Sequence, residues 1–317
     1  MRRHLYILTA TVMLLAGCSG KPVNEVRFLR FEHLLFTTPL PELQKTLVDS
    51  MAQYSTPLLN VAPDDPQFMQ ALAGFVTDPE VRRIYNVTDS LYGDLAWLET
   101  ELSKAMDRSK KVYPELQYTG FYTLVTADFD DYSNRVFCSD NELALSIDRY
   151  AVGALPGAVP AYIERLSSRE YIAADCMAAI ARANIALPDG DLTLLDYIVA
   201  EGKALYYVQQ TLPNTHDTIV LRYTADQLAW MKDNVAPVWG WIIQNKLLYS
   251  TDIGQFHNII DDAPHTNAFG QDSAPRTTAY IGLQIVSRYM KKSGDTMQQL
   301  FDNTDNRAIL TASGWRP

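Results

Sequence analysis

Residues 194–213 read LLDYIVAEGKALYYVQQTLP. This pattern predicts a helix over residues 192–211 with Glu201 in its middle. Residues three and four positions away from Glu201 share its face of the helix. All of them are apolar or aromatic: Tyr197, Ile198, Ala204 and Leu205. A carboxylate on such a face is costly unless it is paired or coordinated, so Glu201 belongs either to a structural ion pair or to a functional site.

The preceding predicted helix supplies polar side chains that could meet Glu201. Over residues 169–185, Asp175 and Arg182 share one face with Ala179. Another face carries residues typical of a core: Ile172, Cys176, Ile180 and Ala183. Asp175 and Arg182 are therefore the polar candidates of this helix for a contact with Glu201.

Helical patterns dominate the chain, and a β-rich stretch interrupts them. TGFYTLVTADF is rich in Thr, Tyr and Phe and predicts a strand, and SNRVFCS and ELALSIDRY predict two more. These three segments span residues 119–129, 133–139 and 142–150. Helices are predicted over residues 40–54, 64–74, 78–89, 95–112, 160–166, 169–186, 192–211, 224–248, 275–292 and 295–302. The pattern indicates a helix-rich α+β fold with one small β-sheet, in a single domain over residues 31–317.

The composition is that of a globular protein and argues against several classes of function. The chain has 317 residues, of which 47% are hydrophobic and 20% charged, and its formal net charge is −10. This charge argues against binding to nucleic acid or to an anionic membrane surface. Five histidines are few for transition-metal chemistry, and three cysteines are too few for a disulfide scaffold. We therefore expect no cofactor, and we expect Cys138 and Cys176 to be free thiols.

The N-terminus has the pattern of an export signal that ends in a lipid attachment site. Two arginines precede an apolar stretch that is too short to span a bilayer. Residues 15–18 read LAGC, which resembles a bacterial lipobox, and such signals are cut before the cysteine, which is acylated. We expect a signal peptide over residues 1–17, a palmitate-type anchor on Cys18 and a tether over residues 18–30. The alternative is an ordinary cleaved signal in which the cysteine occurs by chance.

Motifs of the common enzyme classes are missing from the sequence. It contains no HExxH, GxSxG, P-loop or GxGxxG pattern. One group of imidazole and acidic side chains lies close together in sequence: His257, Asp261, Asp262 and His265. This group could be read as a metal site, but we favour a solvated acidic loop. No catalytic residue and no metal ligand is predicted.

Several long stretches resemble one known family. They are LALSIDRYAVG (143–153), LLDYIVAEGKALYYVQQTLP (194–213), TADQLAWMKDNVAPVWGWIIQNKLLYSTD (224–252), DDAPHTNAFG (261–270) and APRTTAYIGLQIVSRYMKK (274–292). Together with the lipobox they are similar to the gliding-motility lipoprotein GldB family of Bacteroidota, over roughly residues 28–317. The resemblance implies a lipid-anchored protein of the cell envelope that supports the surface machinery of gliding or secretion. It implies no biochemical activity.

That family is distantly similar to zinc peptidases of the gluzincin type. These carry HExxH on one helix and a glutamate ligand in an E-G-x-A motif on the next, which Glu201-Gly202-Lys203-Ala204 matches. HExxH would fall on residues 175–179, which read DCMAA, so both histidines and the general-base glutamate are missing. The resemblance thus implies a degenerate zincin-like domain, a pseudo-enzyme with a vestigial site at Asp175 and Glu201. Without a metal Glu201 needs a cation, for which Arg276 and Arg182 are candidates, and we favour Arg276.

The favoured function is therefore non-enzymatic, with the membrane and other envelope proteins as partners. We expect an anchor at the outer membrane, on its periplasmic or its surface face. One alternative is a metal-dependent hydrolase with unusual ligands. Another is a glycan- or peptide-binding lipoprotein, for which Trp230, Trp239, Trp241 and Tyr249 could form an aromatic platform. Trp239 and Trp241 point about 200° apart on a helix, so they cannot share a face, and helix packing is the favoured use.

Overall fold

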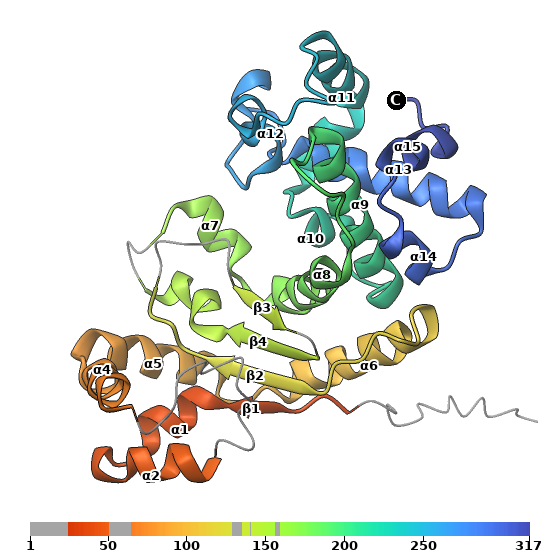
Figure 1. Cartoon of the computed structure of the whole chain (residues 1–317). Coiled ribbons are helices and arrows are strands. Elements are labelled where there is room, and N and C mark those ends of the chain that lie inside the picture. Colours follow the sequence, from red (N-terminus) through yellow and green to blue (C-terminus); the bar gives the residue numbers. More distant parts are fainter. Residues whose placement is uncertain (1–24, 51–64, 129–134, 140, 156–158) are drawn as a thin grey trace, which may run out of the picture.

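One mixed β-sheet lies in the lower half of the molecule, and most of the helices stand above it (Figure 1). The structure is a computed structural model that describes residues 25–50, 65–128, 135–139, 141–155 and 159–317. The predicted helix-rich α+β fold with one small sheet is confirmed. The predicted signal peptide and Cys18 lie outside the described residues.

The sheet has four strands in the order β1-β2-β4-β3. The strands are β1 (Phe28–Arg30), β2 (Gly120–Leu124), β3 (Val136–Ser139) and β4 (Glu142–Ser146). β2 pairs in parallel with both β1 and β4, with Phe121 opposite Phe28 on one side and Leu143 on the other. β3 is the edge strand and runs antiparallel to β4.

Helices cover both faces of this sheet, and most of them lie above it. They are α1 (Phe31–Thr37), α2 (Leu40–Ser50), α4 (Pro66–Thr77), α5 (Pro79–Tyr92), α6 (Ala96–Val112), α7 (Ala161–Leu166), α8 (Ile172–Asn184), α9 (Leu194–Thr211), α10 (Asp217–Leu221), α11 (Ala225–Gln244), α12 (His257–Ile260), α13 (Thr277–Ser293), α14 (Met297–Asp302) and α15 (Asn306–Ser313). Among the described residues, no helix combines the length and the apolar character needed to cross a membrane.

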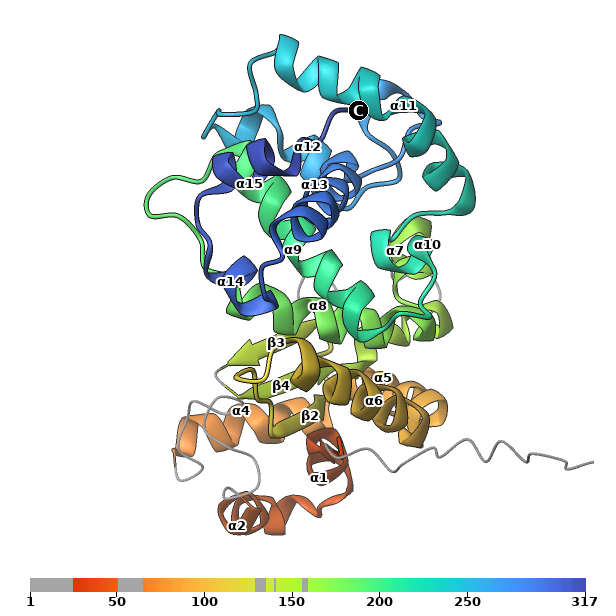
Figure 2. The ribbon, with the colours of Figure 1, turned by 90° about the vertical axis from the view of Figure 1, so that its right-hand side faces the viewer.

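The two faces of the sheet belong to two hydrophobic cores. Phe121, Leu143 and Leu145 face the larger core, which they share with α6, α8 and α9. Tyr122 and Ala144 face a smaller core, formed with α1, α2, α4 and α5. This alternation is the two-residue period of a strand that is covered on both sides. Figure 2 shows α1 and α2 below the sheet and the C-terminal helices above it.

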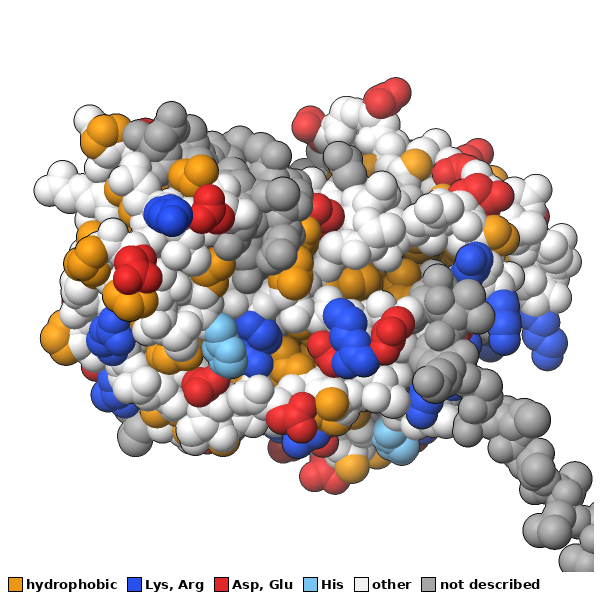
Figure 3. Space-filling view, turned by 90° about the horizontal axis from the view of Figure 1, so that it is seen from below, with side chains coloured by type: hydrophobic (Ala, Val, Ile, Leu, Met, Phe, Trp, Pro, Cys, Tyr) orange, Lys and Arg blue, Asp and Glu red, His pale blue; other side chains and the backbone are white. Residues whose placement is uncertain are grey.

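The described N-terminal helices carry the outer surface below the sheet. Figure 3 looks at this face from below and shows basic and acidic side chains interspersed on it. Hydrophobic side chains lie between them, some singly and some in small groups.

The chain joins the fold earlier than the sequence predicts. Residues 28–30 were expected at the end of the tether, but they form β1 at one edge of the sheet. Val26 is already buried, and its amide donates to Ser103 Oγ (2.9 Å). The boundary at residue 31 is therefore too late. A strand of three residues is too short to show an alternating pattern, which explains why it was missed.

The third predicted strand also ends sooner than expected. β4 stops at Ser146, and residues 147–150 form a 3₁₀ turn. The buried Asp148 side chain accepts hydrogen bonds from the amides of Thr126 (3.2 Å) and Ala127 (2.8 Å) in the loop after β2. These bonds hold the chain out of the strand conformation. Beyond the turn, the hydroxyl of Tyr150 donates a hydrogen bond to Asp175 on α8.

α9 and α13 cross with their backbones in direct contact. α9 begins with a capping box of Thr193 and Asp196. At the crossing, a Cβ atom added to Gly202 would overlap the carbonyl oxygen of Gly282, and one added to Gly282 would overlap the carbonyl oxygen of Ile198. Both positions therefore require glycine, and Gly202 immediately follows Glu201 in the E-G-x-A stretch.

The substitution Gly282→Ala is expected to lower the free energy of unfolding by about 2 kcal/mol, because the two helices must move apart. Gly240→Ala is the matched control. Gly240 also lies within a helix, but nothing lies within 4 Å of an added Cβ there. The control should be neutral or stabilising by about 0.5–1 kcal/mol. Urea denaturation of both variants measures the difference, and equal midpoints would contradict the close crossing.

Candidate functional site

Glu201 is held by two arginines from two other elements. Arg182, on α8, donates from Nε to Oε2 (3.0 Å) and from Nη2 to Oε1 (2.9 Å), which is the bidentate geometry of a strong charge-assisted pair. Arg276, at the start of α13, donates from Nη2 to the same Oε1. Both arginines that the sequence offers as partners therefore contact Glu201. The favoured Arg276 is one partner, and Arg182 is the other.

The helix packing brings these three side chains together. α8 packs beside α9, and the crossing at Gly202 and Gly282 brings the first half of α13 against the middle of α9. Arg276 caps α13 with a left-handed backbone (φ 46°, ψ 43°), so its side chain turns back toward α9. The side chain of Glu201 keeps only 20% of its exposure, which explains how a carboxylate fits an apolar helix face.

Asp175 lies on the same side of α8 but does not contact Glu201. Its Oδ2 accepts a hydrogen bond from the hydroxyl of Tyr150 (2.8 Å), and its Oδ1 accepts one from Arg222 Nη1. Arg222 follows α10 and also has a left-handed backbone (φ 63°). The guanidinium of Arg135 lies farther away, with Nη1 4.0 Å from Oδ2 of Asp175.

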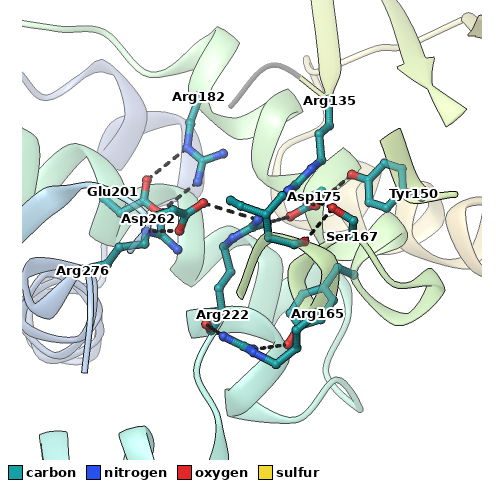
Figure 4. Close-up of polar contacts among 12 residues, drawn as sticks. Arg135, Tyr150, Arg165, Ser167, Asp175, Arg182, Glu201, Arg222, Asp262 and Arg276 are labelled. Carbon is teal, nitrogen blue, oxygen red and sulfur yellow. Dashed lines mark hydrogen bonds and ion pairs between the residues drawn. The ribbon is translucent and has the colours of Figure 1, made fainter. Parts of the chain in front are cut away.

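Asp262 joins these two groups, although its sequence neighbourhood predicts only a solvated acidic loop. Its Oδ1 lies 3.3 Å from Arg276 Nε, and its Oδ2 lies 3.4 Å from Arg222 Nη2. Figure 4 shows the resulting ladder of alternating charges, which runs from Glu201 through Arg276, Asp262 and Arg222 to Asp175. The loop was expected to be a solvated acidic loop, which is wrong for Asp262 but holds for its exposed neighbour Asp261.

The arginines keep two acids of the ladder, Glu201 and Asp262, ionised. Burial alone would raise the pKa of Glu201, but Arg182 and Arg276 outweigh burial and lower this pKa to about 2. Burial would likewise raise the pKa of Asp262, and Arg222 and Arg276 lower it to about 2. The pKa of Arg135 is lowered by burial and by the neighbouring Arg222. Glu201 and Asp262 are therefore ionised at neutral pH.

These contacts decide whether the residues would fit a zinc ion. A catalytic zinc takes three protein ligands and keeps an open position for water. Both carboxylate oxygens of Glu201 and both of Asp175 are engaged by arginine or tyrosine donors. The described residues contain no group of three or more His, Cys, Asp or Glu side chains arranged to hold a metal. The donor set therefore does not fit a catalytic zinc.

Two cavities meet at this site. The first, which we call the charged cavity, has a volume of about 330 Å³ and is lined by all members of the ladder together with Arg135 and Arg182. The second, which we call the apolar groove, has a volume of about 370 Å³ and is lined mainly by apolar side chains of α8, α9, α13 and their loops. The two cavities share Arg182, Glu201, Ile260, Asp261 and Arg276.

Other residues singled out from the sequence lie apart from the ladder. His257 Nδ1 lies 3.1 Å from the carbonyl oxygen of Gly254, at the exposed surface. Cys138 and Cys176 are free thiols, as expected. Trp239 packs edge to face on Trp315, which supports the packing interpretation of the tryptophans. The other two tryptophans of the suggested aromatic platform, Trp230 and Trp241, both pack on Phe269.

The sequence profile of one family, described as gliding motility protein GldB, matches residues 19–317. The chain belongs to the GldB family. Membership of the GldB family indicates a lipoprotein related to gliding motility, located in the cell envelope. Comparison with curated proteins and with solved structures gave no match.

The fold is expected to weaken as the pH falls from about 5 to about 2. Glu201 and Asp262 have folded-state pKa values of about 2, below the value of about 4 for an unfolded chain. Their stabilisation is therefore complete above about pH 5 and is lost as the pH falls through the folded-state pKa. Urea midpoints at several pH values from 6 to 3 measure this loss.

The variant Glu201→Gln should lose less of its stability between these pH values, because one of the titrating groups is gone. Asp233→Asn, on an exposed part of α11, is the control and should keep the full loss. An undiminished loss in Glu201→Gln would show that Glu201 does not contribute.

Proposed function

We propose that the chain is a lipid-anchored envelope protein whose domain supports gliding- or secretion-type surface machinery by binding, without catalysing a reaction. Family membership supports the envelope and motility parts of this proposal. The binding part of the proposal rests on the hydrogen bonds that the carboxylate of Glu201 accepts. Its two oxygens accept hydrogen bonds from Arg182 and Arg276, which leaves neither oxygen free for a metal ion.

The charges around Glu201 support binding over metal-dependent hydrolysis. A guanidinium remains protonated at any physiological pH, so Arg182 and Arg276 are permanent cations in contact with this carboxylate. They donate hydrogen bonds to both oxygens of the carboxylate, and their positive charges repel a metal cation. Asp175 is satisfied in the same way by Arg222. What these side chains offer to a ligand is a set of guanidinium donors, which suits recognition of an anion.

The lipid anchor is the second part of the proposal. Cleavage before Cys18 and acylation of this residue would give the protein several acyl chains, which hold a protein on a bilayer far more firmly than one chain does. The membrane is then the first partner, and other proteins of the envelope are the second. We place the anchor in the outer membrane.

Purified lipoprotein without an affinity tag is expected to contain no stoichiometric zinc or other transition metal. Inductively coupled plasma mass spectrometry measures the metal content after incubation with zinc and dialysis. Added zinc should leave the melting temperature unchanged, because a metal that binds only the folded state would raise it. The protein should not cleave a peptide library.

The alternative, a hydrolase with unusual ligands, predicts the opposite result. It would be supported by one equivalent of metal that is lost in Glu201→Gln and retained in the surface control Asp233→Asn. That outcome would overturn the non-enzymatic proposal.

The substitution Cys18→Ala is expected to abolish incorporation of a fatty-acid label and to remove the chain from the outer-membrane fraction. Ser19→Ala, at the neighbouring position, should retain both the label and the location. Metabolic labelling and membrane fractionation in a bacterium that processes lipoproteins measure these outcomes. Persistent labelling of the Cys18→Ala chain would refute acylation at this residue.

A further inference from the structure

The charged cavity brings together four arginines and four acids, and one charge of each sign lies at its exposed side. Its walls carry Arg135, Arg182, Arg222 and Arg276, against Asp175, Glu201 and Asp262. The fourth acid of the lining, Asp261, lies at the exposed rim, where water solvates it. The charges balance in number, but buried charges are normally also paired at close range, so a buried arginine without a close carboxylate calls for an anion from outside the chain.

Arg135 is the arginine with the weakest pairing. Its side chain is only 5% exposed, yet its nearest carboxylate contact, to Asp175, is 4.0 Å long. Its hydrogen bond from Nη2 goes to the neutral hydroxyl of Ser167 (3.1 Å). Two further guanidinium nitrogens, Arg222 Nε and Arg276 Nη1, are buried and have no hydrogen-bond partner within the described part of the chain.

Arg182 lies where the charged cavity meets the apolar groove, and it lines both. Its Nε and Nη2 are used by Glu201. Figure 4 shows its remaining terminal nitrogen pointing away from Glu201, toward the side of Arg135 and Asp175. The side chain is 47% exposed, so an incoming ligand can reach this nitrogen.

The apolar groove differs from the charged cavity in the side chains of its walls. Beyond the shared residues, its walls are mainly aliphatic and aromatic: Ile185, Leu187, Leu192, Tyr197, Ala200 and Ala279. Leu187 is 50% exposed at the margin of the groove. A concave, largely apolar surface with a few polar groups at one end is the usual form of a small-ligand site.

We propose that these two cavities together bind an apolar molecule that ends in a carboxylate. The carboxylate lies at Arg182 and Arg135 in the charged cavity, and the apolar body lies in the groove along Tyr197 and Ala200. A planar carboxylate matches the donor fork of a guanidinium. Its negative charge supplies the close anion that Arg135 lacks within the described residues. The same chemistry occurs in a fatty acid and in the C-terminus of an apolar peptide.

This inference rests on the proposed binding function and can fail separately from it. Bound metal in the purified protein would overturn the proposed function. Metal-free protein that binds neither kind of ligand would overturn this inference alone.

The test uses the lipoprotein in phospholipid nanodiscs, with empty nanodiscs as the blank. Octanoate is titrated against octanol, and N-acetyl-dileucine with a free carboxylate against its C-terminal amide, by isothermal calorimetry. Binding of octanoate but not octanol would identify a fatty-acid-like ligand, and binding of the free peptide but not the amide would identify a peptide C-terminus. No binding of either acid, or equal binding of the neutral partner, would overturn the proposal.

Two variants locate the site. Arg182→Gln should weaken binding of the acid by at least about tenfold, because a charge-assisted pair is lost while Arg276 still holds Glu201. Ala200→Phe should abolish binding by filling the groove, and it leaves every arginine in place. Arg83→Gln, which affects only a surface pair with Glu80 on α5, is the control and should bind normally. Unchanged binding in both site variants would show that the ligand lies elsewhere.

Discussion

The backbone contact between α9 and α13 fixes the position of the charges in the site. Gly202 and Gly282 carry no side chains, so the two helices approach until only backbone atoms separate them. This approach brings the first residue before α13, Arg276, within hydrogen-bond distance of Glu201. A wider crossing would leave a carboxylate on an apolar helix face without this cation. The geometry of the charged ladder is thus set by two positions that carry no charge.

The ladder itself contributes more to arrangement than to stability. Removing several ions from water costs about as much free energy as their mutual attraction returns, so buried ion pairs are poor evidence for stabilisation. Their hydrogen bonds nevertheless require one geometry. Asp262 ties the loop after α12 to the start of α13 and to the residue after α10, and Asp175 ties that residue to α8. Four segments that are distant in sequence therefore meet in one arrangement.

The sequence identified Glu201 because its neighbours three and four positions away are apolar. A carboxylate on such a helix face is costly unless it is paired or coordinated, and this argument needs no structure. It also identified Arg182, Arg276 and the helix-rich α+β fold. It named Asp262 only as one member of an acidic loop and could not show that this side chain turns inward, because its neighbours Asp261 and His265 have the composition of an ordinary surface loop. Arg222 and Arg135 gave no signal, since their partner lies tens of residues away and no periodicity connects them. β1 was too short for a pattern, and the early end of β4 depends on a contact with another loop.

Arg222 and Arg276 share an unusual backbone. Both lie in the left-handed region, next to a helix end, where glycine is the most common residue. A non-glycine residue in that conformation raises the energy of the folded state by about 1 kcal/mol. Selection for thermal robustness alone would favour glycine at both positions. A long cationic side chain stands at each of them instead, so this region is less stable than it could be, and in return it holds opposite charges close together.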